Sequence, residues 1–147
     1  MQISDFLAPD DVVLRIRASD KEQLLQELAH RAAERLNLPE QEIASELLKR
    51  EGLGSTGMGN GVAIPHARFA AIAKPFGMIA RLKQPIDFEA IDGQPVDIVF
   101  LLLLPNSSTG EQLGALACVS RKLRVADDLV RLRRAKKAAD LYAALRA

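Results

Sequence analysis

The sequence predicts an α/β fold formed by one domain that spans residues 1–147. Segments typical of strands alternate along the chain with segments typical of helices, and the connections between them are short. A chain of 147 residues has the usual size of one domain, and 48% apolar residues are enough to build a substantial core. No internal repeat or low-complexity segment interrupts this alternation.

The first predicted strand covers residues 11–16, where DVVLRI has the β-branched apolar content of a strand. A helix is expected next, because Ser19 and Glu22 have the spacing of a capping box at a helix start. Apolar residues then recur at every fourth position and predict the buried stripe of this helix, which comprises Leu24, Leu28, Ala32 and Leu36.

A second helix is predicted over residues 40–51, EQEIASELLKRE. Asn37 and Pro39 are turn residues that separate it from the first helix, and Gly52 ends it. Its inward-facing residues are expected to be Ile43 and Leu47.

Three further strands are predicted in the middle of the chain. Residues 62–64, VAI, form a short strand, and VDIVFLLLL at residues 96–104 is continuous enough in apolar residues to be a fully buried strand that Pro105 ends. The segment 76–82 shows alternation, which predicts one buried face made by Phe76, Met78, Ala80 and Leu82.

The C-terminal part is predicted to be helical. The polar segment NSSTG leads into a helix whose buried side is expected to hold Leu113, Leu116, Ala117 and Ser120. Short helices are predicted around residues 127–134 and 138–145.

Composition excludes several classes of protein. No apolar run reaches the roughly 18 residues that a membrane-spanning helix needs, and the N-terminus MQISDFLAPDD lacks the basic and apolar regions of a signal peptide. Cys118 is the single cysteine, and with two histidines there is no set of residues at zinc-ligand spacing. We therefore expect a cytoplasmic protein without membrane insertion and without a metal site.

Basic residues are concentrated at the C-terminal end. Residues 119–147 hold 9 Lys and Arg against 3 Asp and Glu, whereas residues 1–118 hold 11 against 16. A nucleic-acid surface also carries such charge, but it is expected to offer stacking aromatic residues, and this segment contains only Tyr142. Solvated outer faces of the last helices are the favoured interpretation, and nucleic-acid binding remains the disfavoured alternative.

The glycine-rich segment LGSTGMGNGVAIPHAR, residues 53–68, holds the candidate binding groups. Its glycines can adopt positive φ, so successive N–H groups can converge into a nest that binds an anion such as phosphate. The expected participants are Gly57, Gly59 and Gly61, with the hydroxyl groups of Ser55 and Thr56 as further donors. The segment matches neither the Walker A motif nor the dinucleotide pattern G-x-G-x-x-G, which disfavours nucleotide binding.

His66 is the candidate nucleophile. It is predicted at the C-terminal end of the short strand, where α/β sheets place ligands, and Pro65 restricts the backbone beside it. A neutral imidazole can carry a phosphoryl group, and Arg50 or Arg68 could bind the phosphoryl oxygens. An ordinary turn with a polar histidine is equally compatible with these residues alone. For His30, on the first long helix, we expect a solvated or core-edge position.

Residues 47–68, LLKREGLGSTGMGNGVAIPHAR, resemble the active-site signature of the enzyme IIA domains of the phosphotransferase system, of the mannitol/fructose type. The segments ISDFLAPDDVVL, KEQLLQELAHRAAE, IDFEAIDGQPVDIVFLLLLP and DLYAAL follow in family order. The resemblance implies a mixed β-sheet flanked by helices on both faces, with His66 as the phosphorylated residue. It also implies that phosphate is bound by Arg50. The other residues that we expect to bind phosphate are Ser55, Thr56, Asn60 and Gly61.

Two positions bear on the branch of this family. Sugar-transporting relatives tend to have glutamate at the position of Asn60, so the GNG sequence favours the regulatory, nitrogen-related branch. Gln112 occupies the place where the family usually has a second histidine. Glutamine can orient a ring but never becomes cationic, so we expect phosphate to be accepted while onward transfer to sugar-specific domains is slow or absent.

The resemblance implies a cytoplasmic phosphocarrier that needs no cofactor. Its implied phosphoryl donor is an HPr-like phosphocarrier protein (NPr), and its implied targets are potassium-transport regulators or sensor kinases. Two alternatives remain: a IIA component of a fructose- or mannitol-type sugar system, and a binding module of the same fold that is never phosphorylated.

Overall fold

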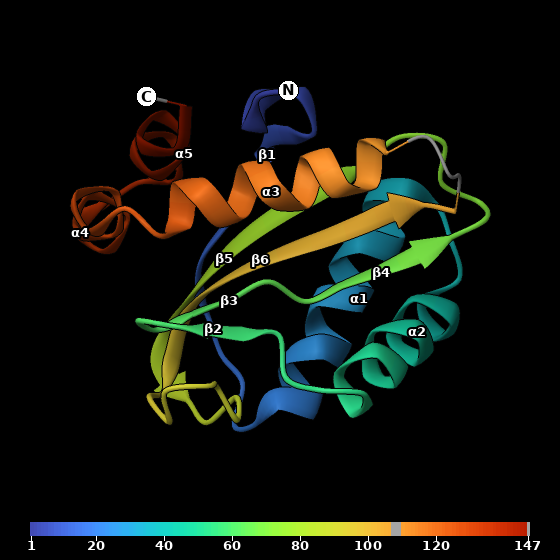
Figure 1. Cartoon of the computed structure of the whole chain (residues 1–147), viewed down its shortest axis with the longest axis horizontal. Coiled ribbons are helices and arrows are strands. Elements are labelled where there is room, and N and C mark those ends of the chain that lie inside the picture. Colours follow the sequence, from blue (N-terminus) through green and yellow to red (C-terminus); the bar gives the residue numbers. More distant parts are fainter. Residues whose placement is uncertain (107–109, 147) are drawn as a thin grey trace.

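The computed structural model describes residues 1–106 and 110–146, without the side chains of Glu111 and Gln112. Six strands in these residues form one mixed sheet (Figure 1). The strands are β1 (Leu7–Ile16), β2 (Gly57–Gly59), β3 (Val62–Ala63), β4 (His66–Phe69), β5 (Phe76–Ile86) and β6 (Val96–Pro105).

β6 organises the sheet. It pairs antiparallel with β5 along one edge, and β5 pairs parallel with β1. Along its other edge β6 pairs parallel with two short strands in succession, first β3 and then β4. β2 completes the sheet as the antiparallel partner of β3. The chain segment of the candidate site therefore follows one edge of the most buried strand.

Helices cover both faces of the sheet, as expected (Figure 1). One face packs against α1 (Lys21–Leu36) and α2 (Glu40–Gly52). The other face packs against α3 (Glu111–Leu123), α4 (Ala126–Arg134) and α5 (Ala138–Arg146), together with the short 3₁₀ helix η1 (Ile3–Asp5). The predicted α/β class and all the predicted helices are confirmed.

The long apolar run of β6 is explained by these two layers of helices. Successive side chains of a strand point to opposite faces, so Leu101 and Leu103 join the core under α1 and α2, while Phe100 and Leu102 join the core under α3–α5. Every residue of β6 except Asp97 is buried. A strand covered on both sides needs apolar residues at consecutive positions.

One prediction for β5 is wrong. The alternation at residues 76–82 predicted a single buried face, but both faces are buried. Gly77 and Ile79 are buried as well, and Ile79 belongs to the core on the α3 side. At Gly77 an added Cβ would lie 2.8 Å from the Phe100 ring, which leaves no room for a side chain. The strand is therefore buried on both faces at residues 77–80, because helices cover both sides of the sheet.

Two helix predictions also need correction. α1 is capped by Asp20, whose carboxylate accepts a hydrogen bond from the Gln23 N–H, and not by Ser19 with Glu22. In α3 the fully buried stripe comprises Ala115, Val119 and Leu123. The expected inward residues Leu113 and Ala117 are exposed instead, because the helix is rotated so that Ala115, Val119 and Leu123 face the core.

The helices found among the described residues are too short or too polar to cross a bilayer.

Candidate functional site

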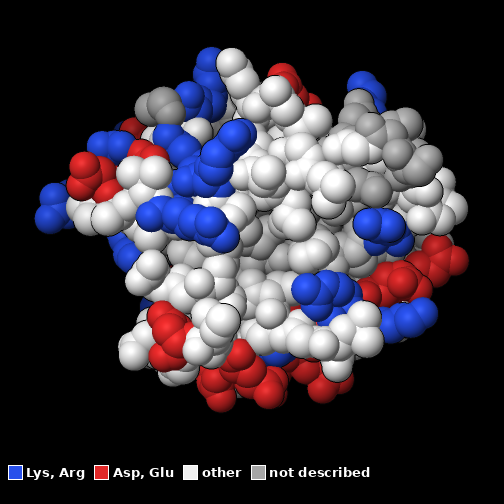
Figure 2. All heavy atoms as spheres, viewed as in Figure 1, with Lys and Arg blue, Asp and Glu red and all other residues white. Residues whose placement is uncertain are grey.

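A cleft of about 1170 Å³ opens between α2 and α3, with β4 between them. Its lining includes His66, Arg50, Arg68 and Lys49, and the α3 side supplies Leu113 and Leu116. Figure 2 shows this face of the molecule, where Lys and Arg side chains border an uncharged area. The cleft therefore combines a histidine with positive charge and an apolar wall.

His66 is the first residue of β4 and not the last residue of the preceding strand. β3 and β4 both pair with β6, and Ile64 and Pro65 separate them without belonging to either strand. Between the two strands the Leu102 N–H donates to the Pro65 carbonyl at 2.9 Å. The sequence predicted His66 at the end of the short strand. In the structure two further residues follow β3, and His66 begins the next strand, β4. The histidine lies at the beginning of a second parallel strand, held on β6 opposite Leu102.

The imidazole of His66 is oriented by the backbone. Its Nδ1 lies 2.8 Å from the carbonyl oxygen of Ile64. Because a carbonyl can only accept a hydrogen bond, Nδ1 carries the proton in the neutral ring, and Nε2 has the lone pair. The residue two positions earlier in the chain therefore selects which ring nitrogen is nucleophilic.

The pKa of His66 is lowered from its ordinary value of 6.5. Burial of the ring is the main cause, because it disfavours the charged form. The hydrogen bond to Ile64 and the charge of Glu51 raise the pKa, whereas the charges of Arg50 and Arg68 lower it. The lowering effects prevail, so the ring is neutral at physiological pH.

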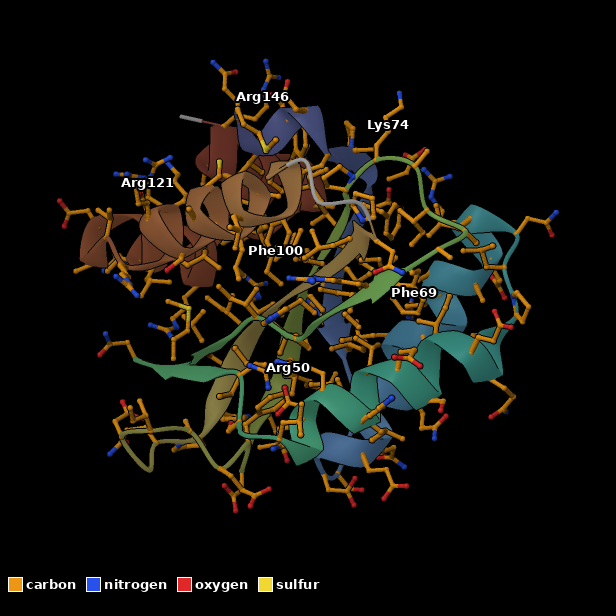
Figure 3. The ribbon with its side chains drawn as sticks, turned by 45° about the vertical axis from the view of Figure 1, so that its right-hand side comes forward. Arg50, Phe69, Lys74, Phe100, Arg121 and Arg146 are labelled. Atoms are coloured by element: carbon orange, nitrogen blue, oxygen red, sulfur yellow. The ribbon has the colours of Figure 1, made fainter. Side chains whose placement is uncertain are left out.

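Arg50 lies in the last turn of α2, and its Nη1 donates to the carbonyl of Gly54 at 2.8 Å. This bond uses one of the five N–H donors of the guanidinium and holds the group near the helix end. Figure 3 shows the Arg50 side chain between the end of α2 and the sheet. Arg68, two residues after His66 in β4, is exposed and lines the same cleft. The structure thus brings together the histidine and both arginines that the sequence indicated.

Ser55 and Thr56 are engaged in other contacts. The hydroxyl of Ser55 donates to the Phe88 carbonyl at 2.6 Å and accepts from the Gly57 N–H at 3.1 Å. Thr56 is buried, and both its hydroxyl and its N–H donate to the carboxylate of Glu51. These groups hold the loop after α2, and neither residue lines the cleft.

Asn60 and Gly61 form the two-residue turn of the hairpin between β2 and β3. Both have positive φ, 58° and 79°, as a type I′ turn requires. The Gly61 carbonyl accepts from Asp97 and Ile98 on β6, whereas His66 lies opposite Leu102. Five residues along a strand correspond to about 16 Å. The positive φ angles therefore serve the hairpin, and the turn lies well away from His66.

Other residues of the cleft were not predicted from the sequence. Lys49, beside Arg50, adds positive charge, and Leu113 is a largely exposed apolar residue on the opposite wall. Leu113 belonged to the stripe that was expected to be buried, so its exposure is visible only in the structure. Gln112 is in the first turn of α3, and its side chain lies outside the described part of the chain.

His30 lies on α1 at the surface, as expected. Its Nδ1 is 2.7 Å from an oxygen of Glu40, and its Nε2 is 3.0 Å from an oxygen of Glu34. The hydrogen bond with Glu40 is the main cause of a raised pKa, and the negative charges of both carboxylates add to it. His30 therefore favours the protonated form, the opposite of His66.

This arrangement predicts a pH-dependent contribution of His30 to stability. Because the pKa is higher in the folded state than its ordinary 6.5, the contribution is complete below that value and is lost as pH rises through the folded pKa. We expect His30→Gln to lower the free energy of unfolding at about pH 6 and to have little effect at about pH 9. Urea denaturation of both proteins at the two pH values measures this. An equal difference at both would show that the ion pairs do not contribute.

The described residues contain no cluster of three or more His, Cys, Asp or Glu side chains that could hold a metal ion. The chemistry that this part of the structure supports is that of a neutral imidazole beside arginines.

Comparison with known proteins identifies the family. Residues 5–147 match the family model of the "Phosphoenolpyruvate-dependent sugar phosphotransferase system, EIIA 2", and the chain belongs to this family of enzyme IIA domains. The resemblance noted from the glycine-rich segment is confirmed.

Among individual proteins, the chain is similar to nitrogen regulatory proteins. It is 46% identical to the one from Bradyrhizobium diazoefficiens over 99% of this chain and 95% of that protein. It is 39% identical to the one from Pseudomonas aeruginosa over 97% and 93%. The crystal structure of nitrogen regulatory protein IIA-Ntr from Neisseria meningitidis has a TM-score of 0.92 at 34% identity, covering 97% of this chain and 98% of that chain. IIA mannitol from Escherichia coli shares the fold, with a TM-score of 0.78 at 18% identity over 94% and 97%.

Proposed function

We propose that the protein is a cytoplasmic phosphocarrier of a nitrogen-related phosphotransferase system. It accepts a phosphoryl group on His66 from an HPr-like phosphocarrier protein (NPr), and its phosphorylation state controls its binding to regulatory targets. The observation that carries this proposal is the hydrogen bond from Nδ1 of His66 to Ile64, which leaves the Nε2 lone pair available beside Arg50 and Arg68.

The proposed step is an in-line transfer. The Nε2 lone pair forms a bond to phosphorus while the bond between phosphorus and the donor's side chain breaks, and the leaving atom keeps its electron pair. Nδ1 retains its proton throughout, because Ile64 continues to accept the hydrogen bond. Charge spreads over the phosphoryl oxygens during transfer, and a guanidinium can bind two of them at once. We assign this role to Arg50, which lies in the last turn of α2.

The surroundings of the cleft suit a protein donor. Leu53 and Leu113 line it and are 84% and 65% exposed, and the cationic residues Lys49, Arg50 and Arg68 line the same cleft. Exposed apolar groups with adjacent charge are typical of docking surfaces. Phosphorylation adds roughly −1.5 to −2 charges at this surface, so a target that docks there should distinguish the two forms. The names of the nitrogen regulatory relatives support the regulatory role, and potassium-transport regulators or sensor kinases are the target classes we propose.

The experiment that tests this function is incubation of the protein with phosphoenolpyruvate and purified enzyme I and HPr-like proteins, followed by intact-mass analysis. A gain of one phosphoryl group supports the proposal. No gain under conditions that phosphorylate the donor would favour a binding module of the same fold. Rapid passage of the group to a fructose-specific IIB domain would favour a sugar-system IIA component.

The lowered pKa of His66 predicts how the reaction depends on pH. Only the neutral ring has the Nε2 lone pair, so we expect the phosphorylation rate to be constant above the pKa and to fall as pH decreases through it. An NMR titration of the ring should have its midpoint below 6.5, and the rate profile should follow the same midpoint once the donor's own pH dependence is subtracted. A midpoint above 6.5 would contradict the electrostatic description of the site.

A further inference from the structure

Glu51 is a buried charge next to Arg50 in the last turn of α2, with its side chain 4% exposed. Its carboxylate accepts three hydrogen bonds: one from the Thr56 hydroxyl, one from the Thr56 N–H at 3.2 Å, and one from Lys21 Nζ at 3.1 Å. A buried carboxylate is costly unless such donors compensate its charge. The carboxylate of Glu51 is thus paired with donors of the protein itself, and Glu51 does not line the cleft.

The contacts of Glu51 continue to the nucleophile through the backbone. The carbonyl of Thr56, the residue that Glu51 holds, accepts from the Ile64 N–H at 3.1 Å. The carbonyl of Ile64 in turn accepts from Nδ1 of His66 at 2.8 Å. Three consecutive hydrogen-bonded links therefore connect the carboxylate with the imidazole proton: Glu51 to Thr56, Thr56 to Ile64, and Ile64 to His66.

Glu51 also supports the arginine. The Gly54 N–H donates to the Glu51 carbonyl at 3.1 Å, and the Gly54 carbonyl accepts from Arg50 Nη1 at 2.8 Å. The loop between α2 and β2 is thus held at Gly54 by the backbone of Glu51 and at Thr56 by its side chain. A shift of this loop would displace the acceptor of Arg50 and the acceptor chain of His66 together.

We propose that Glu51 is a positioning residue for phosphoryl transfer, which keeps His66 in its Nδ1–H tautomer and Arg50 in place through the loop that both depend on. The inference rests on the proposed function, since positioning has an effect only if His66 is phosphorylated. Small displacements of reacting groups reduce rates strongly, so support at this distance from the chemistry matters.

The ammonium group of Lys21 compensates the buried negative charge of Glu51. This group contacts Glu51 and, at 3.2 Å, the exposed Glu89, and it lies 4.9 Å from the centre of the Phe88 ring. The start of α1 and the loop around residue 88 thereby enclose the carboxylate. Glu89 shares the lysine with Glu51 but is 78% exposed and has no place in the links to His66, which makes it a matched control.

The experiment compares Glu51→Gln with Glu89→Gln. Glutamine has nearly the same shape, but its amide nitrogen cannot accept the bonds that the second carboxylate oxygen accepts. For Glu51→Gln we expect the maximal rate of phosphorylation by the HPr-like donor to fall on the order of tenfold, with the half-saturating donor concentration changed less than about twofold. Long-range ¹H–¹⁵N NMR should show a reduced share of the Nδ1–H tautomer of His66. Glu89→Gln should leave rate and tautomer unchanged.

Two substitutions of Thr56 provide a second test, which leaves the ion pair between Glu51 and Lys21 in place. Thr56→Ser keeps the hydroxyl donor and should retain the wild-type rate and tautomer, whereas Thr56→Val removes the donor and should reproduce the effect of Glu51→Gln. A native NMR spectrum identifies the folded fraction, to which all rates are normalised.

The inference is overturned if folded Glu51→Gln and Thr56→Val both keep the wild-type rate and tautomer, or if Glu89→Gln impairs transfer as much as Glu51→Gln. A wild-type protein that accepts no phosphoryl group would instead contradict the proposed function. In that case the tautomer measurement still decides whether Glu51 controls the orientation of His66.

Discussion

Replacement of His66 by alanine is expected to abolish phosphorylation completely. The chain contains two histidines, and only His66 combines a lowered pKa with an Nε2 lone pair beside arginines. His30 favours the protonated form and is bonded through both ring nitrogens to carboxylates, which would repel a phosphoryl group. The measurement is intact-mass analysis after incubation with the phosphorylated donor.

The matched control for this experiment is His30→Ala, which should be phosphorylated as fast as the wild type. The wild-type adduct should be lost in mild acid and stable in base, since P–N bonds are labile to acid. If His66→Ala still gains a phosphoryl group, the acceptor has been assigned to the wrong residue. A phosphorylated His66→Ala protein that loses the group on the additional change His30→Ala would identify His30 as the acceptor.

Arg50→Lys is expected to slow phosphorylation by on the order of tenfold or more, which equals ~1.4 kcal/mol of transition-state stabilisation. Lysine keeps the positive charge, but it lacks the planar pair of donors that can bind two phosphoryl oxygens. Arg50 lies in the last turn of α2 and its Nη1 contacts only the loop carbonyl of Gly54 among its described hydrogen bonds. The domain should therefore stay folded, and the loss should appear in the rate at saturating donor.

Arg68→Lys is the control for Arg50→Lys, because Arg68 lines the same cleft with the same charge but is exposed on β4. We expect a smaller effect for it, since water competes for an exposed guanidinium. Unchanged kinetics for Arg50→Lys, with a native melting temperature, would leave Arg50 only its structural contact with Gly54. An equal effect of both substitutions would indicate that net charge, and not the geometry of one guanidinium, supports transfer.

Local patterns determined much of the fold. The fourfold spacing in α1 correctly predicted that Leu24, Leu28 and Ala32 are buried, whereas Leu36 is only partly buried. The continuous apolar run before Pro105 correctly predicted the central strand β6. These signals are reliable because burial against a neighbouring layer imposes the period of the helix or strand on the sequence. The orientation of α3 was not predictable in the same way, since Leu113 and Ala115 are both apolar and only packing against the sheet decides which is buried.

The sequence by itself determined which residues could perform the chemistry: a histidine behind Pro65, a glycine-rich segment, and arginines on either side. Only the tertiary structure decided their roles. The positive φ of Asn60 and Gly61 serves a hairpin turn at the far end of the edge of β6, and the hydroxyl of Thr56 binds Glu51. A backbone-permissive or polar residue has the same local signature whether it binds an anion or a neighbouring strand. The difference depends on which groups the sheet brings within hydrogen-bonding distance, because β6 aligns Gly61 with Asp97 and His66 with Leu102, separated by about 16 Å.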